Sequence, residues 1–397
     1  MFTRGAGGDE REVHGAVATL AARWREERPA RQGQRALVRG DFDALRAAGL
    51  LRLVVPVDEG GSWVDVATSV RTIAETYRVL AGADASVALV SVMHPAVLGF
   101  WLASADRSQA AWEAQRAAVC ASAAAGRQWG TITSEPGSGG DITRTRATAV
   151  PIASPAELPG ATYALTGDKH FGSGSGVTDF MITTAVPVDG AEPALFAIDV
   201  RGRPWDGTAG ITLLAEWDGM GMAATQSHAM RLDDVPSVRL AWDGPLEQLT
   251  GAAGPFVATL FTAVVLGIFD EAVGTARPAL AGKAAQLRAY EQVEWSRAEQ
   301  DHWVAQQAFD GALRAIESGD PVRAMHGALR AKEAIAELAE ASLTRLTRVL
   351  GGGTFSRRSP FAHWYEDVRA LGFLRPPWGL AYDGLLATSF VTSAAES

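Results

Sequence analysis

The chain has 397 residues, of which 47% are hydrophobic, and its formal net charge is −9. This length allows a large core in two or three domains, and the negative charge gives no electrostatic reason to bind nucleic acid. The single cysteine, Cys120, excludes an intramolecular disulfide and a cysteine-based zinc site, and it fits an intracellular, reducing compartment.

The first part of the chain is expected to be helical. Residues 1–12 are polar and mixed in charge, whereas a signal peptide needs an apolar core, so a cytoplasmic protein is expected. From His14 to about Gln128 the sequence is rich in Ala, Leu, Arg and Glu at helical spacing. Residues 1–128 are therefore predicted to form an N-terminal helical domain, interrupted by the Pro and Gly residues of 54–61.

The pattern changes after residue 128 and again after Pro245. Short runs of Val, Ile, Thr and Phe separated by Gly, Pro and Asp predict a small β domain over 129–247. Long amphipathic helices follow, with breaks near 318–321 and 351–353, so 248–397 is predicted to be a helical bundle. The longest apolar run, 255–269, is shorter than the roughly 20 residues that span a bilayer, which predicts a buried helix and an α+β protein without a membrane segment.

Two polar segments of the expected β domain carry the strongest functional signal. They read W-G-T-I-T-S-E-P at 129–136, followed by G-S-G-G-D, and Y-A-L-T-G-D-K-H-F-G-S-G at 163–174. Their glycines could simply provide positive φ in polar turns. In order and spacing, however, the pair resembles the two flavin-contacting signatures of the acyl-CoA dehydrogenase superfamily, T-E-P-x-x-G-S-D and Y-x-L-x-G-x-K-x-W-I-T-N. Hydroxyl groups in these segments suit the oxygens and N5 of a flavin ring.

The resemblance implies the acyl-CoA dehydrogenase-like fold. Its parts would be the N-terminal helical domain, a central β-barrel-like domain with the flavin and substrate contacts, and a C-terminal four-helix bundle that joins the subunits of a homodimer or homotetramer. The cofactor would be FAD, with FMN as the alternative. The cofactor-binding residues that the two motifs imply are Trp129, Thr131, Thr133, Ser134, Phe171 and Ser173.

Further cofactor contacts are implied in the bundle. Lys283 matches a family arginine that reaches the FAD pyrophosphate of a neighbouring subunit, and Arg348, Gly351 and Gly352 match a Q-x-x-G-G segment beside the dinucleotide. Without the resemblance, Lys283 reads as a solvated helix residue and the glycines as a helix C-cap.

The residues for dehydrogenase chemistry are missing. Removal of an acyl α-proton needs a carboxylate base, and the family's Y-E-G-T glutamate position holds Arg375, which cannot act as one at neutral pH. The family's second base position, within 254–258, has no carboxylate. Glu366 and Asp367 lie upstream, where an ion pair with Arg369 or Arg375 is expected.

A different branch of the superfamily fits better. F-G-S-G at 171–174 resembles the F-C-S-G of the dibenzothiophene monooxygenase-like flavin monooxygenases, and the helix around His94 matches one that carries a histidine near the flavin. Such enzymes receive reduced flavin, add O2, and need an imidazole or hydroxyl for the proton. His94 and Ser173 are the candidate catalytic residues, and His170, His228 and Arg375 are candidates for the substrate pocket.

The leading hypothesis is therefore a two-component monooxygenase that acts on a small organic substrate and has a separate flavin reductase as partner. An acyl-CoA dehydrogenase-like enzyme with a non-standard base, and a catalytically inactive flavin-fold subunit, remain as alternatives. No metal is expected, because the other histidines have no second ligand at the spacing that metal sites use.

Overall fold

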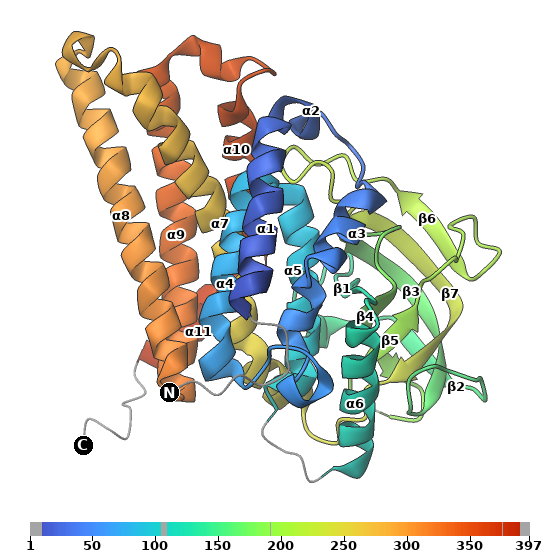
Figure 1. Cartoon of the computed structure of the whole chain (residues 1–397). Coiled ribbons are helices and arrows are strands. Elements are labelled where there is room, and N and C mark those ends of the chain that lie inside the picture. Colours follow the sequence, from blue (N-terminus) through green and yellow to red (C-terminus); the bar gives the residue numbers. More distant parts are fainter. Residues whose placement is uncertain (1–9, 105–108, 191, 375, 390–397) are drawn as a thin grey trace.

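The computed structural model describes residues 10–104, 109–190, 192–374 and 376–389 (Figure 1). Helices of the N-terminal part lie in the middle of the molecule, with the long C-terminal helices on one side and the β-sheet on the other. The N-terminal elements are α1 (Glu10–Glu26), α2 (Arg28–Gln32), α3 (Arg39–Ala47), η1 (Leu50–Val54), η2 (Val57–Glu59), α4 (Val66–Ala83), α5 (Ala85–Leu102) and α6 (Ala110–Ala124).

A single residue, Asp84, separates α4 from α5. Its carboxylate accepts a hydrogen bond from Val87 N at 2.9 Å, which caps the first turn of α5. The same carboxylate accepts from Arg31 Nε at 2.8 Å, and the other end of that guanidinium forks onto Asp41. The start of α5 is thus tied to both α2 and α3.

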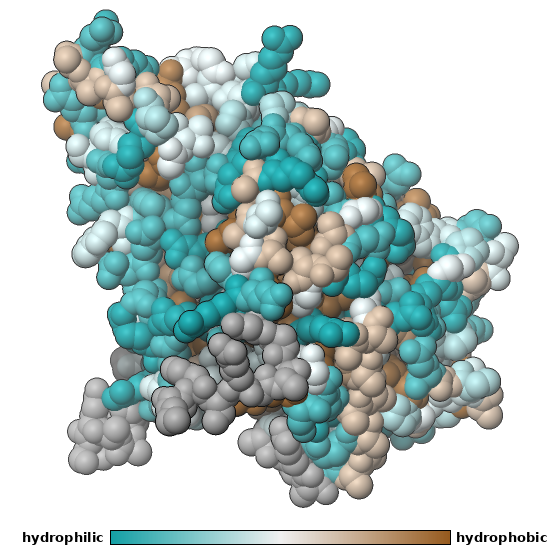
Figure 2. Space-filling model, viewed as in Figure 1, coloured by the Kyte–Doolittle hydropathy of each residue, from teal (hydrophilic) through white to brown (hydrophobic). Residues whose placement is uncertain are grey.

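Two helices are long and apolar enough to cross a membrane by length and composition, α5 and α7 (Leu246–Ala281). In each, 83% of the most apolar window is buried inside the fold. They form its central core, which explains their composition and confirms the prediction of a buried helix over 255–269. The face shown in Figure 2 is mostly hydrophilic, with hydrophobic residues gathered near its middle.

The strands form a sheet that closes on itself. β4 pairs with β2 and β5, and β7 pairs with β3 and β5, so that β4, β2, β3, β7 and β5 make a ring, with β1 added beside β4 and β6 beside β7. The result is barrel-like. The elements of this part are β1 (Trp129–Thr131), η3 (Ile142–Arg144), β2 (Thr148–Pro151), β3 (Thr162–Gly172), β4 (Phe180–Pro187), β5 (Ala194–Asp199), β6 (Ile211–Ala215) and β7 (His228–Arg239).

The C-terminal part packs three long helices together, with shorter ones against them. The break expected near 318–321 is present: Gly319 has a φ of 72°, and Asp320 caps the next helix through Val322 N and Arg323 N. The elements that follow α7 are η4 (Ala284–Gln286), α8 (Ala289–Glu317), α9 (Pro321–Leu350), η5 (Gly352–Phe355), α10 (Pro360–Val368), η6 (Arg369–Phe373) and α11 (Trp378–Ser389).

Candidate functional site

The two motifs singled out in the sequence lie side by side. His170 N donates a hydrogen bond to Ser134 O at 2.8 Å, which joins the end of β3 to the loop after β1. β1 itself pairs in parallel with β4, with Trp129 opposite Phe180. The hydroxyl-bearing residues of both motifs therefore meet at one edge of the barrel.

A buried ion pair fastens the motifs to each other. Lys169 of β3 is completely buried, and its Nζ lies 2.5 Å from Glu135 Oε1 and 2.6 Å from Thr184 O. Glu135 also accepts hydrogen bonds from Thr145 Oγ1 and Arg146 N. Burial alone would raise the pKa of Glu135, but the hydrogen bonds from Lys169 and Thr145 outweigh it and lower the pKa. The carboxylate is thus ionised and paired at neutral pH.

His94 reaches this edge from the middle of α5. Trp129 N donates to His94 Nδ1 at 3.2 Å, so the proton sits on Nε2, which donates to Leu51 O at 3.2 Å. Burial lowers the pKa of His94 to about 4. The ring is therefore neutral at pH 7, in one tautomer, with a backbone partner at each nitrogen. Thr131 Oγ1 donates to the sulfur of Met93, the residue before His94, at 3.8 Å.

Trp129 anchors β1 in an aromatic stack. Its ring lies over Phe180, with centroids 4.7 Å apart, and edge-on to Trp101 at 5.9 Å. The stack continues from Trp101 to Trp112 at 5.6 Å and from Trp112 to the half-buried Trp242 at 5.4 Å. The side chain of Trp129 thus supports the strand from the core side.

Ser173 belongs to a chain of hydroxyl groups whose direction can be assigned. Thr225 Oγ1 donates to Met222 O at 2.8 Å, which uses its only proton. Ser227 Oγ, 2.7 Å from Thr225 Oγ1, must then donate to it, and Ser173 Oγ, 2.8 Å from Ser227 Oγ, must donate to Ser227. The proton of Ser173 is therefore committed, and its oxygen is left to accept a hydrogen bond.

Phe171 is held in a rare backbone conformation. Its φ is 58°, which is costly for a bulky residue, and it follows Lys169 at an irregularity in the β3–β7 pairing. The residue is 57% exposed, and its ring lies edge-on to Trp217, with centroids 6.0 Å apart. The bulge turns this ring toward the solvent at the mouth of the site.

α10 closes another side of the site. Met222 N donates to Asp367 Oδ1 at 2.6 Å, and a Cβ at Gly221 would lie only 2.2 Å from Glu366 O. Burial raises the pKa of Asp367 to about 7. The ion pair expected between these carboxylates and Arg369 is wrong, because Arg369 Nε lies 3.4 Å from Glu340 of α9 instead. The other expected partner, Arg375, lies outside the described residues.

The remaining cofactor candidates form a second group at the far end of the helices. Lys283 follows the C-terminus of α7, and Arg348 lies near the end of α9, just before Gly351 and Gly352. Arg348 Nη1 is 3.2 Å from Glu294 of α8. Figure 1 shows this end of α7, α8 and α9 on the side away from the barrel, so one chain does not bring the two groups together.

Two of the three candidates for the substrate pocket lie on paired strands, His170 on β3 and His228 at the start of β7, where it is opposite Gly172. His170 packs edge-on to Phe171 at 6.1 Å, at the motif edge. The buried His228 accepts from Trp217 N at 2.9 Å and packs on Trp205 at 5.4 Å, and burial lowers its pKa. Arg375 lies outside the described residues. Within the described ranges, no cluster of three or more His, Cys, Asp or Glu residues that could hold a metal ion is found.

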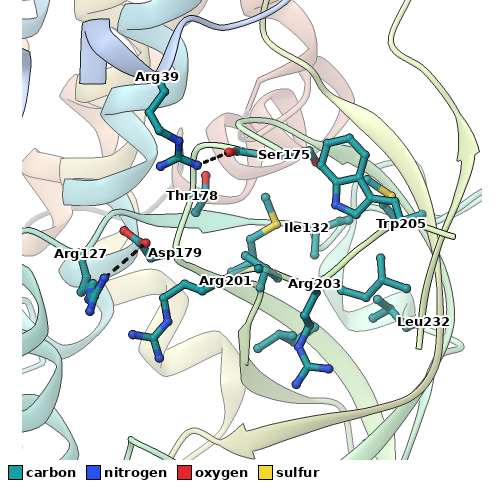
Figure 3. A pocket seen from close by; sticks show the side chains of 17 residues that line it. Arg39, Arg127, Ile132, Ser175, Thr178, Asp179, Arg201, Arg203, Trp205 and Leu232 are labelled. Atoms are coloured by element: carbon teal, nitrogen blue, oxygen red, sulfur yellow. Dashed lines mark hydrogen bonds and ion pairs between the residues drawn. The ribbon is translucent and has the colours of Figure 1, made fainter. Parts of the chain in front are cut away.

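A cavity of about 400 Å³ opens between the walls of the barrel (Figure 3). Its floor is apolar and its rim carries Arg39, Arg127, Arg201 and Arg203. Ile132, between the motif residues Thr131 and Thr133, forms part of its wall. No sequence pattern indicated this cavity, because its lining comes from strands far apart in the chain.

Comparisons with known proteins agree with this arrangement. No protein-family model matches the chain. Amino sugar nitrososynthase DnmZ from Streptomyces peucetius is 29% identical over 367 residues, which cover 84% of this chain and 82% of DnmZ. Dibenzothiophene monooxygenase from Rhodococcus erythropolis is 28% identical over 276 residues, which cover 65% of this chain and 60% of that enzyme.

A solved structure extends the comparison to the whole fold. FMN-bound TdsC from Paenibacillus sp. A11-2 superposes on the chain with a TM-score of 0.77 at 20% identity, covering 95% of this chain and 97% of TdsC. TdsC has also been solved with FMN and indole. The helix, barrel and helix order predicted from the sequence is therefore the fold of this neighbour.

Proposed function

We propose, for a chain that has the acyl-CoA dehydrogenase-like fold and whose relatives are flavin-dependent monooxygenases and nitrososynthases, that it is a two-component monooxygenase. It would receive reduced flavin from a separate reductase and use O2 to oxidise a small organic substrate. When bound, the flavin supplies the oxygen chemistry, and the residues of this chain bind it, orient it and handle protons.

The hydroxyl chain that ends at Ser173 is the observation that carries this proposal. Because Ser173 donates to Ser227, its oxygen can only accept from a ligand. N5 of a reduced flavin carries a hydrogen and donates, whereas N5 of an oxidised flavin accepts. A serine fixed as an acceptor therefore favours the reduced cofactor, as a two-component enzyme requires.

The test is a comparison of reduced and oxidised FMN binding under anaerobic conditions. We expect the intact protein to prefer reduced FMN, and Ser173→Ala to reduce that preference by about 2- to 10-fold, the value of one neutral hydrogen bond. Ser227→Ala frees the proton of Ser173 to donate, so it should improve the binding of oxidised FMN.

Ser237→Ala is a matched control. Ser237 is a buried serine of β7 whose hydroxyl donates to Tyr163 O inside the barrel. Its loss should leave the ratio of the two affinities unchanged. No flavin binding by the intact protein, or the same ratio in all three variants, would refute the proposal.

FMN is favoured over the FAD expected from the sequence. The proposal rests on FMN-bound TdsC and on the second group of candidates, where Arg348 is already paired with Glu294 and Lys283 lies at the far end of α7. If the adenosine half is not needed, Lys283→Ala should bind FMN as the intact protein does. FAD binding that is tighter than FMN binding and lost in Lys283→Ala would favour FAD.

His94 is proposed as the group that handles a proton at this site. Its buried, neutral ring carries that proton on Nε2. Both ring nitrogens have backbone partners, so the ring must exchange one of these bonds to act. Ser173 is proposed to act beside it by accepting a hydrogen bond from the cofactor.

Assembly is part of the proposal. A homodimer or homotetramer would let the second group of residues of one subunit approach the motifs of another, which a single chain does not achieve. Light scattering should therefore give a multiple of the 41.8 kDa chain mass.

The dehydrogenase alternative has its own test. Rapid bleaching of the bound flavin by an acyl-CoA would support a dehydrogenase over a monooxygenase.

A further inference from the structure

We propose that the cavity in the barrel is a second ligand site, distinct from the flavin site, which binds a hydrophobic organic acid. The ligand class is an apolar body of alkyl or aromatic carbon with one terminal carboxylate. Nothing in the proposed reaction requires this site, so it stands on its own observations.

The floor of the cavity is the incompletely filled core of the barrel. Met181, Ile198, Met230 and Leu232 line it, and each is at most 3% exposed to solvent. Protein interiors are normally close-packed, whereas this cavity of about 400 Å³ falls within the range of small-molecule sites. Two flexible methionine side chains allow the floor to adapt to a ligand.

The rim supplies the opposite chemistry. Four arginines face one aspartate, Asp179, among the lining residues, although the whole chain has a net charge of −9. Arg201 is neutralised by Asp199 and Glu157, each at 2.5 Å. Arg127 Nη1 lies 3.9 Å from Asp179 Oδ1, which is a long ion pair. The same aspartate also accepts a hydrogen bond from Gln128 N.

Arg203 is the best placed to hold a carboxylate. Its Nε donates to Asp199 O at 2.7 Å and its Nη1 to Ala209 O at 3.1 Å, which fixes the half-buried guanidinium. The Asp199 carboxylate attracts this charge but is itself bonded to Arg201. Arg39 is bound in a similar way, to Gly176 O. In the part of the chain that the structure describes, no ion-pair partner is found for either, so an anion would complete the rim.

The cavity lies next to the motifs, but the motif hydroxyl groups of Thr131, Thr133, Ser134 and Ser173 do not line it. The side chain of Ile132 lines the cavity and approaches Gly172, where an added Cβ would lie 2.7 Å from Ile132 Cδ1. Ser175 and Thr178, in the loop after Ser173, also line it. A bound acid would therefore pack against the back of the loop that holds Ser173.

Titration with octanoate and with octan-1-ol, followed by calorimetry on the full chain, tests the proposal. Octanoate should bind saturably, and octan-1-ol about 10-fold or more weaker, because it lacks the charge for Arg203. Arg203→Gln should weaken octanoate by about 10-fold while octan-1-ol changes less than about 2-fold. Met230→Trp, which fills the cavity, should abolish binding of both ligands.

Two further measurements keep the outcome clear. Arg277→Gln, an exposed arginine of α7 paired with Glu299, is the control and should bind octanoate normally. Arg203→Gln should bind FMN like the intact protein, so a failure of the flavin proposal would not be confused with a failure of this one. No saturable octanoate binding, or equal binding of acid and alcohol that Arg203→Gln leaves unchanged, would overturn the second site.

Discussion

The buried pair of Glu135 and Lys169 should stabilise the barrel only as a pair. Changing one partner leaves a buried charge without its counterion, which typically costs about 3–5 kcal/mol. Changing both removes both charges, and replacement of a whole buried ion pair is often close to neutral. A double-mutant cycle on this pair should therefore give two large single losses of stability, a small double loss and a large coupling energy.

The magnitudes follow from what each partner keeps. In Lys169→Met, Glu135 retains donors from Thr145 Oγ1, Arg146 N and Ala147 N, so its carboxylate stays partly satisfied. We expect a loss of about 3 kcal/mol. In Glu135→Gln, the completely buried Lys169 loses the carboxylate of its ion pair. The amide NH2 of the glutamine can also face the backbone N–H donors, so a loss of about 5 kcal/mol is expected.

The double variant should lose at most about 2 kcal/mol instead of the sum of about 8 kcal/mol, which corresponds to a coupling energy of at least about 6 kcal/mol. Urea unfolding at pH 7.5, followed by circular dichroism, measures the free energies of all four proteins. Thr166→Val, at an exposed position of the same strand where the hydroxyl contacts Asp234, is the control and should change stability by less than about 0.5 kcal/mol. Losses that add within about 0.5 kcal/mol would refute the reasoning.

Three other changes have expected outcomes. Phe171→Gly should raise the urea midpoint by relieving a strained φ of 58° worth about 1 kcal/mol, yet weaken FMN binding in a fluorescence titration; a lower midpoint would contradict the strain. Asp367 has a pKa raised to about 7 by burial, so its contribution to stability is full below about pH 4 and is lost as pH rises to about 7. Asp367→Asn should lack this loss, and parallel midpoint-against-pH curves for the two proteins would argue against it. His94→Ala should still bind reduced FMN but release hydrogen peroxide faster with O2, by about 10²-fold or more if the ring handles a proton; a normal release rate with a lower melting temperature would leave His94 a packing residue.

Most of the fold could be predicted because its signals are local. The apolar run of α7 and the Gly-Asp-Pro break before α9 mark a buried helix and a helix start through the chemistry of neighbouring residues. The two motifs were likewise predicted to work together, and the contact between Ser134 and His170 brings them together.

The parts that escaped prediction depend on contacts between distant residues. The hydroxyl chain joins Ser173 to Ser227, 54 positions away, and only the folded barrel shows the direction of its protons. Asp367 near the end of α10 and Arg369 at the start of η6 are two positions apart, and such residues do not share a helix face. Asp367 therefore contacts the loop at Met222 and Arg369 contacts Glu340, which is why the ion pair expected with Arg369 was wrong.

The tryptophan stack behind β1 has an optical consequence. The rings of Trp129, Trp101, Trp112 and Trp242 form a row in which successive centroids are 5.4–5.9 Å apart. These distances are short enough for excitation absorbed by one ring to migrate to the others. Trp129 ends this row on the very strand that carries Thr131. A chromophore that absorbs in the near ultraviolet and binds at that strand would quench the fluorescence of all four tryptophans by energy transfer. Intrinsic tryptophan fluorescence would therefore report whether the site is occupied.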